Sequence, residues 1–92
     1  MNNKAILKFP LSVQDTTILN MPVGSEVLHF DSQYDVLNIW AICDTKAVVT
    51  EERVFFLAVT GERLPQGNLK YIGTVLLSSG TMVVHLFEVI KP

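Results

Sequence analysis

The stretch that decides the fold is residues 53–60, which read Arg-Val-Phe-Phe-Leu-Ala-Val-Thr. After the arginine the stretch is apolar at odd and even positions alike, and Gly61 follows it at once. A short run rich in β-branched and aromatic residues, bounded by a turn residue, is typical of a β-strand covered on both faces. The same rhythm recurs along the chain as short runs of Val, Ile, Leu and Phe, each closed by a turn signal. No segment has the periodicity of a long amphipathic helix.

This rhythm predicts an all-β fold, a compact six- or seven-stranded antiparallel sandwich or small barrel. Residues 44–52 are expected to be mainly a connection, in which Ala47-Val48-Val49 could add a short strand. With 92 residues, the chain is expected to form one domain over residues 1–92. Besides residues 53–60, strands are expected at residues 4–9, 16–21, 26–33, 36–43, 69–77 and 81–90.

Turn residues and alternation add local detail. Pro10 indicates a strand end or an edge strand, and Tyr34-Asp35 is a plausible tight hairpin connection. Gly73, inside a strand, indicates a bulge or a close backbone approach.

Two neighbouring strands differ in their polarity. In residues 26–33 alternation places Leu28 and Phe30 on one face, and Val27 with His29 on the other. Residues 36–43 are apolar on both faces except at Asn38, which favours a central strand.

Composition favours a covered surface. Hydrophobic residues make up 49% of the chain and charged residues only 17%, below the usual fraction of about 25%. We therefore expect a homo-oligomer or another partner over part of the apolar surface, although two-sided strands in a small monomer would also raise the apolar fraction. The net charge is −2 and the seven cations are dispersed, so no duplex nucleic acid partner is expected.

The single cysteine and the N-terminal sequence bear on location. Cys43 alone forms no intrachain disulfide and no multi-cysteine zinc site, and this favours a reducing compartment. The sequence begins without a signal-peptide pattern, and its apolar runs are too short to span a membrane. We therefore expect a cytoplasmic protein with no membrane partner.

The polar residues within the strands show no catalytic set. His85 and Glu88 fall on opposite faces of one strand, which makes them poor partners for acid–base chemistry. Ser78 and Ser79 lie in a turn without a nucleophile-elbow pattern, and no histidine is near Cys43 in sequence. The sequence therefore predicts no enzyme, no metal site and no cofactor.

Arg53 has two interpretations. If it shares a face with Phe55 and Leu57, its guanidinium needs a buried partner or a ligand. Otherwise it lies at a strand end and pairs with Glu51 or Glu52, as exposed charges commonly do.

A binding site can be assembled from dispersed residues. Aromatic rings could stack a base, although core or interface positions explain them equally well. Cations could pair with phosphate, and the Thr60–Pro65 segment combines a glycine backbone, a hydroxyl and an arginine as an anion-binding candidate. His85 could contact a ligand or be a structural histidine. The candidate ligand-binding residues are Trp40, Arg53, Thr60, Arg63, Lys70, Tyr71 and His85.

Several short motifs, in order and spacing, are similar to those of a family of small uncharacterised proteins encoded by phages and prophages. One departure is Glu62, which stands where relatives often have a histidine after the Thr-Gly pair. The matching motifs are Lys8-Phe9-Pro10-Leu11, Met21-Pro22 with Gly24, Trp40-Ala41, Arg53 with Phe55, Thr60-Gly61, Tyr71-Ile72-Gly73-Thr74, and His85 with Phe87-Glu88.

The resemblance implies a protein made in the cytoplasm of an infected or lysogenic bacterium, with no established activity. Our leading hypothesis is a non-enzymatic binding protein that counters host defence. In its most specific form, the protein is a sponge that sequesters a nucleotide-derived immune signal in an oligomeric pocket. The alternative is a protein–protein inhibitor or accessory factor that binds a host or phage protein through a strand edge or an apolar patch.

Overall fold

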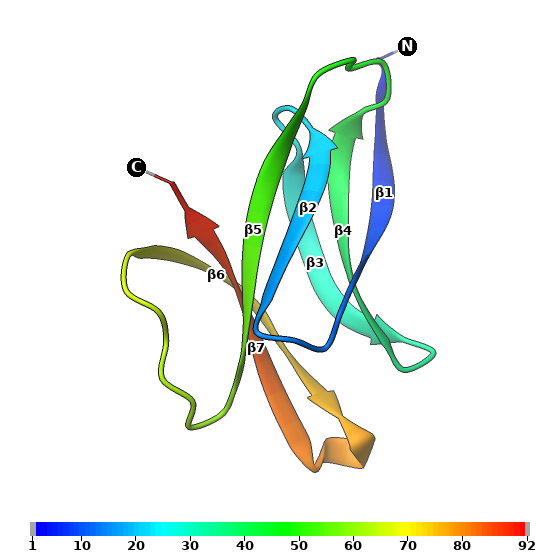
Figure 1. The fold of residues 1–92 in the computed structure, drawn as a ribbon. Coiled ribbons are helices and arrows are strands. Elements are labelled where there is room, and N and C mark those ends of the chain that lie inside the picture. Colours follow the sequence, from blue (N-terminus) through cyan, green and yellow to red (C-terminus); the bar gives the residue numbers. More distant parts are fainter. Residues whose placement is uncertain (1, 92) are drawn as a thin grey trace.

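A computed structural model describes residues 2–91, and Met1 and Pro92 lie outside the described residues. The all-β prediction is confirmed, and the upper expected number of strands is the one found. Figure 1 shows the arrangement. The strands are β1 (Lys4–Leu11), β2 (Thr16–Pro22), β3 (Glu26–Gln33), β4 (Val36–Asp44), β5 (Thr50–Val59), β6 (Asn68–Leu77) and β7 (Met82–Ile90), with a short 3₁₀ turn at Ser78–Gly80 before the last.

The strands form two antiparallel sheets. One has the order β1-β4-β3 and the other the order β2-β5-β7-β6. The sheets pack as a sandwich in which β3 lies beside β6 without joining the two hydrogen-bonded ladders into a closed barrel. As predicted, β4 is a central strand and β1, which contains Pro10, is an edge strand.

The core lies between the sheets and is built by alternate residues of the strands. Phe55 and Leu57 of β5 meet Leu86 of β7, and β4 contributes its odd-numbered residues from the facing sheet. The buried core consists of Leu11, Met21, Phe30, Leu37, Ile39, Ala41, Cys43, Phe55, Leu57, Val75, Val84 and Leu86.

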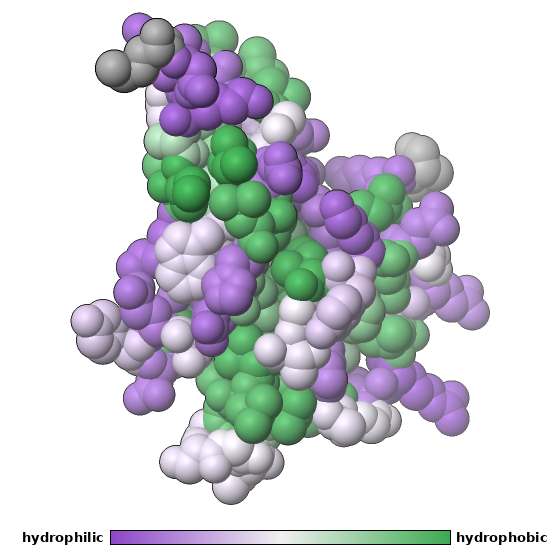
Figure 2. Space-filling view, turned by 180° about the vertical axis from the view of Figure 1, so that it is seen from behind, coloured by the Kyte–Doolittle hydropathy of each residue, from purple (hydrophilic) through white to green (hydrophobic). Residues whose placement is uncertain are grey.

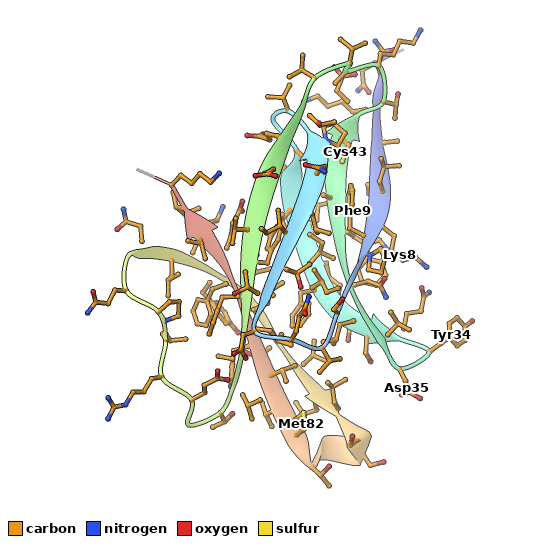
Figure 3. The ribbon with its side chains drawn as sticks, in the orientation of Figure 1. Lys8, Phe9, Tyr34, Asp35, Cys43 and Met82 are labelled. Carbon is orange, nitrogen blue, oxygen red and sulfur yellow. The ribbon has the colours of Figure 1, made fainter. Side chains whose placement is uncertain are left out.

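Two predicted turn features are confirmed. Tyr34 and Asp35 alone connect β3 to β4, and both have positive φ (51° and 64°), as in the twisted two-residue turns of hairpins. They lie at the tip of the hairpin, away from the core (Figure 3). The register of β6 against β7 shifts between Tyr71 and Gly73, which is the expected bulge. A Cβ at Gly73 would lie 3.6 Å from the Phe30 Cβ, which is an ordinary van der Waals contact.

Two local predictions are wrong. A second bulge shifts the register of β3 between Val27 and His29, so Val27 packs with Phe30 against the core and Leu28 is exposed. The extra residue reverses the alternation on which the prediction depended. The predicted connection at residues 44–52 holds over residues 45–49, where Ala47-Val48-Val49 adds no strand, but it is wrong for residues 50–52, because β5 begins already at Thr50.

The β5–β6 connection is unusual. Both strands are antiparallel to β7, which lies between them, so they are parallel to each other. Parallel strands are usually joined by a dozen or more residues, often a helix that covers the sheet. Here residues 60–67 alone return along the sheet, and they arch past β7 on the side away from the other sheet (Figure 1). This connection is too short to form a covering layer.

The hairpin tip yields a stability prediction. Tyr34 is 93% exposed and gains no packing, yet it adopts a left-handed conformation that disfavours bulky residues. We expect Tyr34→Asn to stabilise the protein by about 0.5–1 kcal/mol, because asparagine tolerates this conformation. Tyr34→Val, equally exposed but β-branched, should destabilise it. Thermal unfolding of the two variants measures both signs, and equal shifts would contradict the argument.

Candidate functional site

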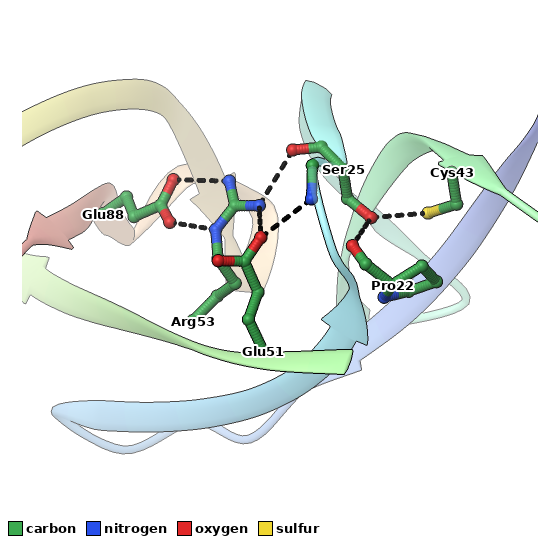
Figure 4. A network of polar contacts seen from close by, with 7 residues as sticks. Pro22, Ser25, Cys43, Glu51, Arg53 and Glu88 are labelled. Carbon is green, nitrogen blue, oxygen red and sulfur yellow. Dashed lines mark hydrogen bonds and ion pairs between the residues drawn. The ribbon is translucent and has the colours of Figure 1, made fainter. Parts of the chain in front are cut away.

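An ion pair lies between the sheets where the apolar core ends. Arg53 of β5 donates from Nη2 to Glu88 Oε1 of β7 (3.0 Å) and from Nε to Glu88 Oε2. Its Nη1 donates to the Ser25 carbonyl (2.8 Å) and lies 3.8 Å from Glu51 Oε2 (Figure 4). The side chains of Arg53 and Glu88 are only 16% and 9% exposed, so the pair is largely removed from water. The guanidinium therefore connects β5 and β7 to the start of β3.

Both interpretations of Arg53 from the sequence are partly met. It shares the inward face with Phe55, and its main partner is Glu88, 35 residues away, with Glu51 as a second, longer contact. The hydrogen bonds to Glu88 raise the pKa of the Arg53 guanidinium, the charges of Glu88 and Glu51 act in the same direction, and burial opposes them. Arg53 thus carries a charge that is already neutralised within the fold.

The residues around this pair are tied together as well. The Ser25 hydroxyl donates to the Pro22 carbonyl (2.6 Å), and the Cys43 Sγ lies 3.2 Å from the same hydroxyl oxygen. Glu51 accepts from the backbone N–H of Gly24 (2.9 Å), which has a positive φ of 78°. The Pro22–Ser25 turn is therefore held against the ion pair from both sides (Figure 4).

Two open hollows flank the ion pair, with volumes of about 330 Å³ and 250 Å³. Lys70 borders both hollows together with Arg53, and Lys91 is a third cation at the larger one. Acidic residues match the cations in each hollow, so neither has a surplus positive charge for a phosphate. The larger is bordered by Glu51, Glu52, Arg53, Val54, Lys70, Glu88, Val89, Ile90 and Lys91, and the smaller by Ser25, Glu26, Val27, Leu28, Arg53, Lys70, Tyr71, Ile72 and Glu88.

A chain of hydroxyls and one imidazole lies on the outer face of the four-stranded sheet. Tyr71 Oη lies 2.5 Å from Thr74 Oγ1, which lies 2.9 Å from His85 Nδ1. His85 Nε2 lies 2.8 Å from Thr60 Oγ1, and this hydroxyl lies 3.4 Å from the Val83 carbonyl. One set of proton positions satisfies every contact. Tyr71 donates to Thr74, Thr74 donates to His85 Nδ1, His85 Nε2–H donates to Thr60, and Thr60 donates to the Val83 carbonyl.

The β6 bulge builds this chain. Without it, Tyr71 and Thr74, three residues apart, would face opposite sides of the sheet. The register shift places Tyr71 opposite Phe87 and Thr74 opposite His85 on the same outer face. The Tyr71 ring meets Phe87 edge to face, with ring centroids 5.6 Å apart.

The predicted binding residues therefore fall into separate places. Thr60, Tyr71 and His85 join in one hydrogen-bonded chain, whereas Arg53 and Lys70 border the two hollows beside the ion pair. Trp40 lies on β4, paired in register with Lys8 and His29 on the outer face of the other sheet. Its ring centroid is 5.9 Å from that of His29, while Arg63 lies exposed in the β5–β6 connection.

Thr74 and Glu88 were not predicted as binding-site residues. The glycine-marked bulge was a signal that could have placed Thr74 beside Tyr71. The Arg53–Glu88 contact needed the knowledge that β5 and β7 are neighbours, which no local pattern supplies.

Within residues 2–91, no three His, Cys, Asp or Glu side chains are grouped so that they could hold a metal ion. The same residues contain no helix that is long and apolar enough to cross a membrane.

Fold and sites define a small, open β-sandwich that combines an internal ion pair with a hydroxyl–imidazole chain on an outer sheet face. The chain belongs to DUF7352, a domain of unknown function whose family model matches residues 2–92. No curated protein and no solved structure matches it.

The ion pair yields a double-mutant prediction. Arg53→Met alone should cost about 3 kcal/mol, because it leaves the Glu88 carboxylate buried without its partner. Adding Glu88→Leu should recover most of that loss, since an apolar pair of similar volume leaves no buried charge without a partner. Urea unfolding of the wild type, the two single variants and the double variant measures the coupling. Additive losses would show that the two side chains act independently.

Proposed function

We propose that the protein acts by binding a partner rather than by turning over a substrate. Both ring nitrogens of His85 are engaged by threonine hydroxyls. Glu88 lies on the other face of the same strand and is bound to Arg53. This arrangement supports a binding role, because neither group has a partner suited to acid–base work.

The observation that carries the proposal is the outer face of the four-stranded sheet. One row across the strands is Ile18–Val54–Val89–Leu69, and the next is Thr16–Phe56–Phe87–Tyr71. An antiparallel sheet with one solvated face normally alternates apolar inside and polar outside. Here both faces carry apolar rows; on the outer face Ile18 and Tyr71 are exposed, and the apolar residues between them are half-buried.

A protein surface is the partner that this face favours. Tyrosine is typical of the energetic centre of protein interfaces, and Tyr71 lies exposed on this face with its ring against Phe87. Figure 2, which shows the molecule from behind, has further apolar groups on the surface between polar ones. In the phage setting that the sequence resemblance implies, the partner is a host defence protein in the bacterial cytoplasm.

Nucleotide sequestration is the second candidate. It is supported by Thr60, Tyr71 and His85, which together offer an aromatic ring and several hydrogen-bonding groups on one face. Arg63, in the connection that begins at Thr60, is the cation available to a phosphate there. Arg53 contributes less than expected, since its charge is already neutralised by Glu88.

Tyr71→Ala tests both candidates, with Tyr34→Ala as the matched control. A complex that co-purifies from infected cells, or a cyclic nucleotide that raises the melting temperature, should weaken by about 10–100-fold in Tyr71→Ala and be unchanged in Tyr34→Ala. Isothermal titration with the purified partner or nucleotide measures the affinity and identifies which class binds. Conversion of the bound molecule to a product would overturn the proposal of a non-enzymatic protein.

A further inference from the structure

The four sheet edges of this molecule are not equally protected. Edge strands expose unpaired backbone groups, and proteins block unwanted pairing with charges, prolines, bulges or covering elements. β1 carries Lys4, Lys8 and Pro10. β3 and β6 each contain a bulge and lie beside one another.

β2 carries none of these devices before its last residue. Its sequence Thr-Thr-Ile-Leu-Asn-Met-Pro has no charged residue, its register with β5 is unbroken, and its proline stands at the last position. Ile18, in the middle of the strand, is 58% exposed. Among the strands at sheet edges, β2 is thus the one open to pairing.

The backbone direction of β2 is fixed by two hydrogen bonds. Leu57 N–H donates to the Asp15 carbonyl (2.8 Å), and Val23 N–H donates to the Val49 carbonyl (3.1 Å). Odd-numbered residues therefore point their backbone groups toward β5. Because these groups alternate along a strand, Thr16, Ile18 and Asn20 point theirs away from β5, to the free edge.

We propose that this edge pairs with β2 of a second copy, antiparallel and centred on Ile18. A two-fold axis at Ile18 sets Thr16 opposite Asn20 of the other copy, and Ile18 opposite its equivalent. Polar then meets polar, apolar meets apolar, and the three pairs each exchange two hydrogen bonds. A two-fold axis at Leu19 would instead pair Thr16 with Pro22 of the other copy. Pro22 has no N–H, and its carbonyl already accepts from Ser25.

The exposed area and the lack of charge favour a second copy as the occupant. The chain exposes 6155 Å², whereas a compact monomer of 10.3 kDa exposes about 5,350 Å². The excess of about 800 Å² equals the area that one partner contributes to a standard interface. An uncharged, self-complementary edge brings no like charges together when it meets its own copy.

The paired sheet would have eight strands and one continuous outer row. Ile18 would meet its equivalent, and the aliphatic row Ile18–Val54–Val89–Leu69 would run on into the second copy. The inference goes beyond the proposed function, because it requires neither a ligand nor a foreign protein.

The first test is mass in solution. Sedimentation equilibrium of the wild type should give twice 10.3 kDa at high micromolar concentration. Ile18→Lys places two lysines opposite each other and should raise the dimer dissociation constant on the order of 100-fold. Ile6→Lys, on the edge strand β1 and equally exposed at 60%, should leave the dimer intact. A monomeric wild type, or a dimer unaffected by Ile18→Lys, would overturn the proposal.

The second test fixes the register and does not depend on the lysine variant. In the proposed pair, the two Ile18 Cα atoms lie about 5.5 Å apart, within the range that a disulfide spans. Copper-phenanthroline, as the oxidant, should therefore cross-link Ile18→Cys into a covalent dimer, while Ile6→Cys stays monomeric on a denaturing gel. Cys43 is buried and does not compete. Equal cross-linking of both variants would overturn the Ile18-centred register, whatever the fate of the partner-binding proposal.

Discussion

The Arg53–Glu88 pair marks where the apolar core ends and fixes which charges near it remain available. Along β5 the inward positions pass from Leu57 and Phe55 to Arg53, and along β7 from Leu86 to Glu88, so the interior changes from apolar to ionic at one level of both strands. Two charges that leave water together must satisfy one another. They do so here through two hydrogen bonds within the four-stranded sheet, and the bond from Arg53 Nη1 to the Ser25 carbonyl links that sheet to the start of β3 beyond the apolar core. The guanidinium is therefore not free to recruit an anion.

The second constraint is that the four-stranded sheet is apolar on both sides. The inner side meets the other sheet, whereas within residues 2–91 no further sheet or helical layer covers the outer side. A helix in the β5–β6 connection would have made a third layer. Its absence from the described chain leaves the aromatic and aliphatic rows half-buried, with Ile18 and Tyr71 exposed at their ends and a polar chain of hydroxyls and His85 beside them. Under the proposal that the protein binds a partner, this combination suits a partially apolar surface better than a highly charged ligand.

The strands could be predicted because each is marked by its own apolar and β-branched residues. The Tyr34-Asp35 turn could be predicted because the two strands beside it left only two residues between them. It found the bulge at Gly73, where glycine marks it, and missed the one at Leu28, where nothing in the local sequence does. The candidate site was predicted as one set and is found as several. Strand order decides which faces meet, and it depends on pairings between distant residues that no local pattern encodes.

The outer face and the β2 edge are linked through a single residue. Ile18 begins the aliphatic row that crosses the four-stranded sheet, and it also stands at the centre of the unprotected strand. If the edge pairs with its own copy, the two outer faces become one surface of doubled width, and a partner that binds there contacts both chains. Binding and assembly would then reinforce each other, because a ligand that prefers the joined surface must stabilise the dimer by the same factor with which the dimer improves its affinity.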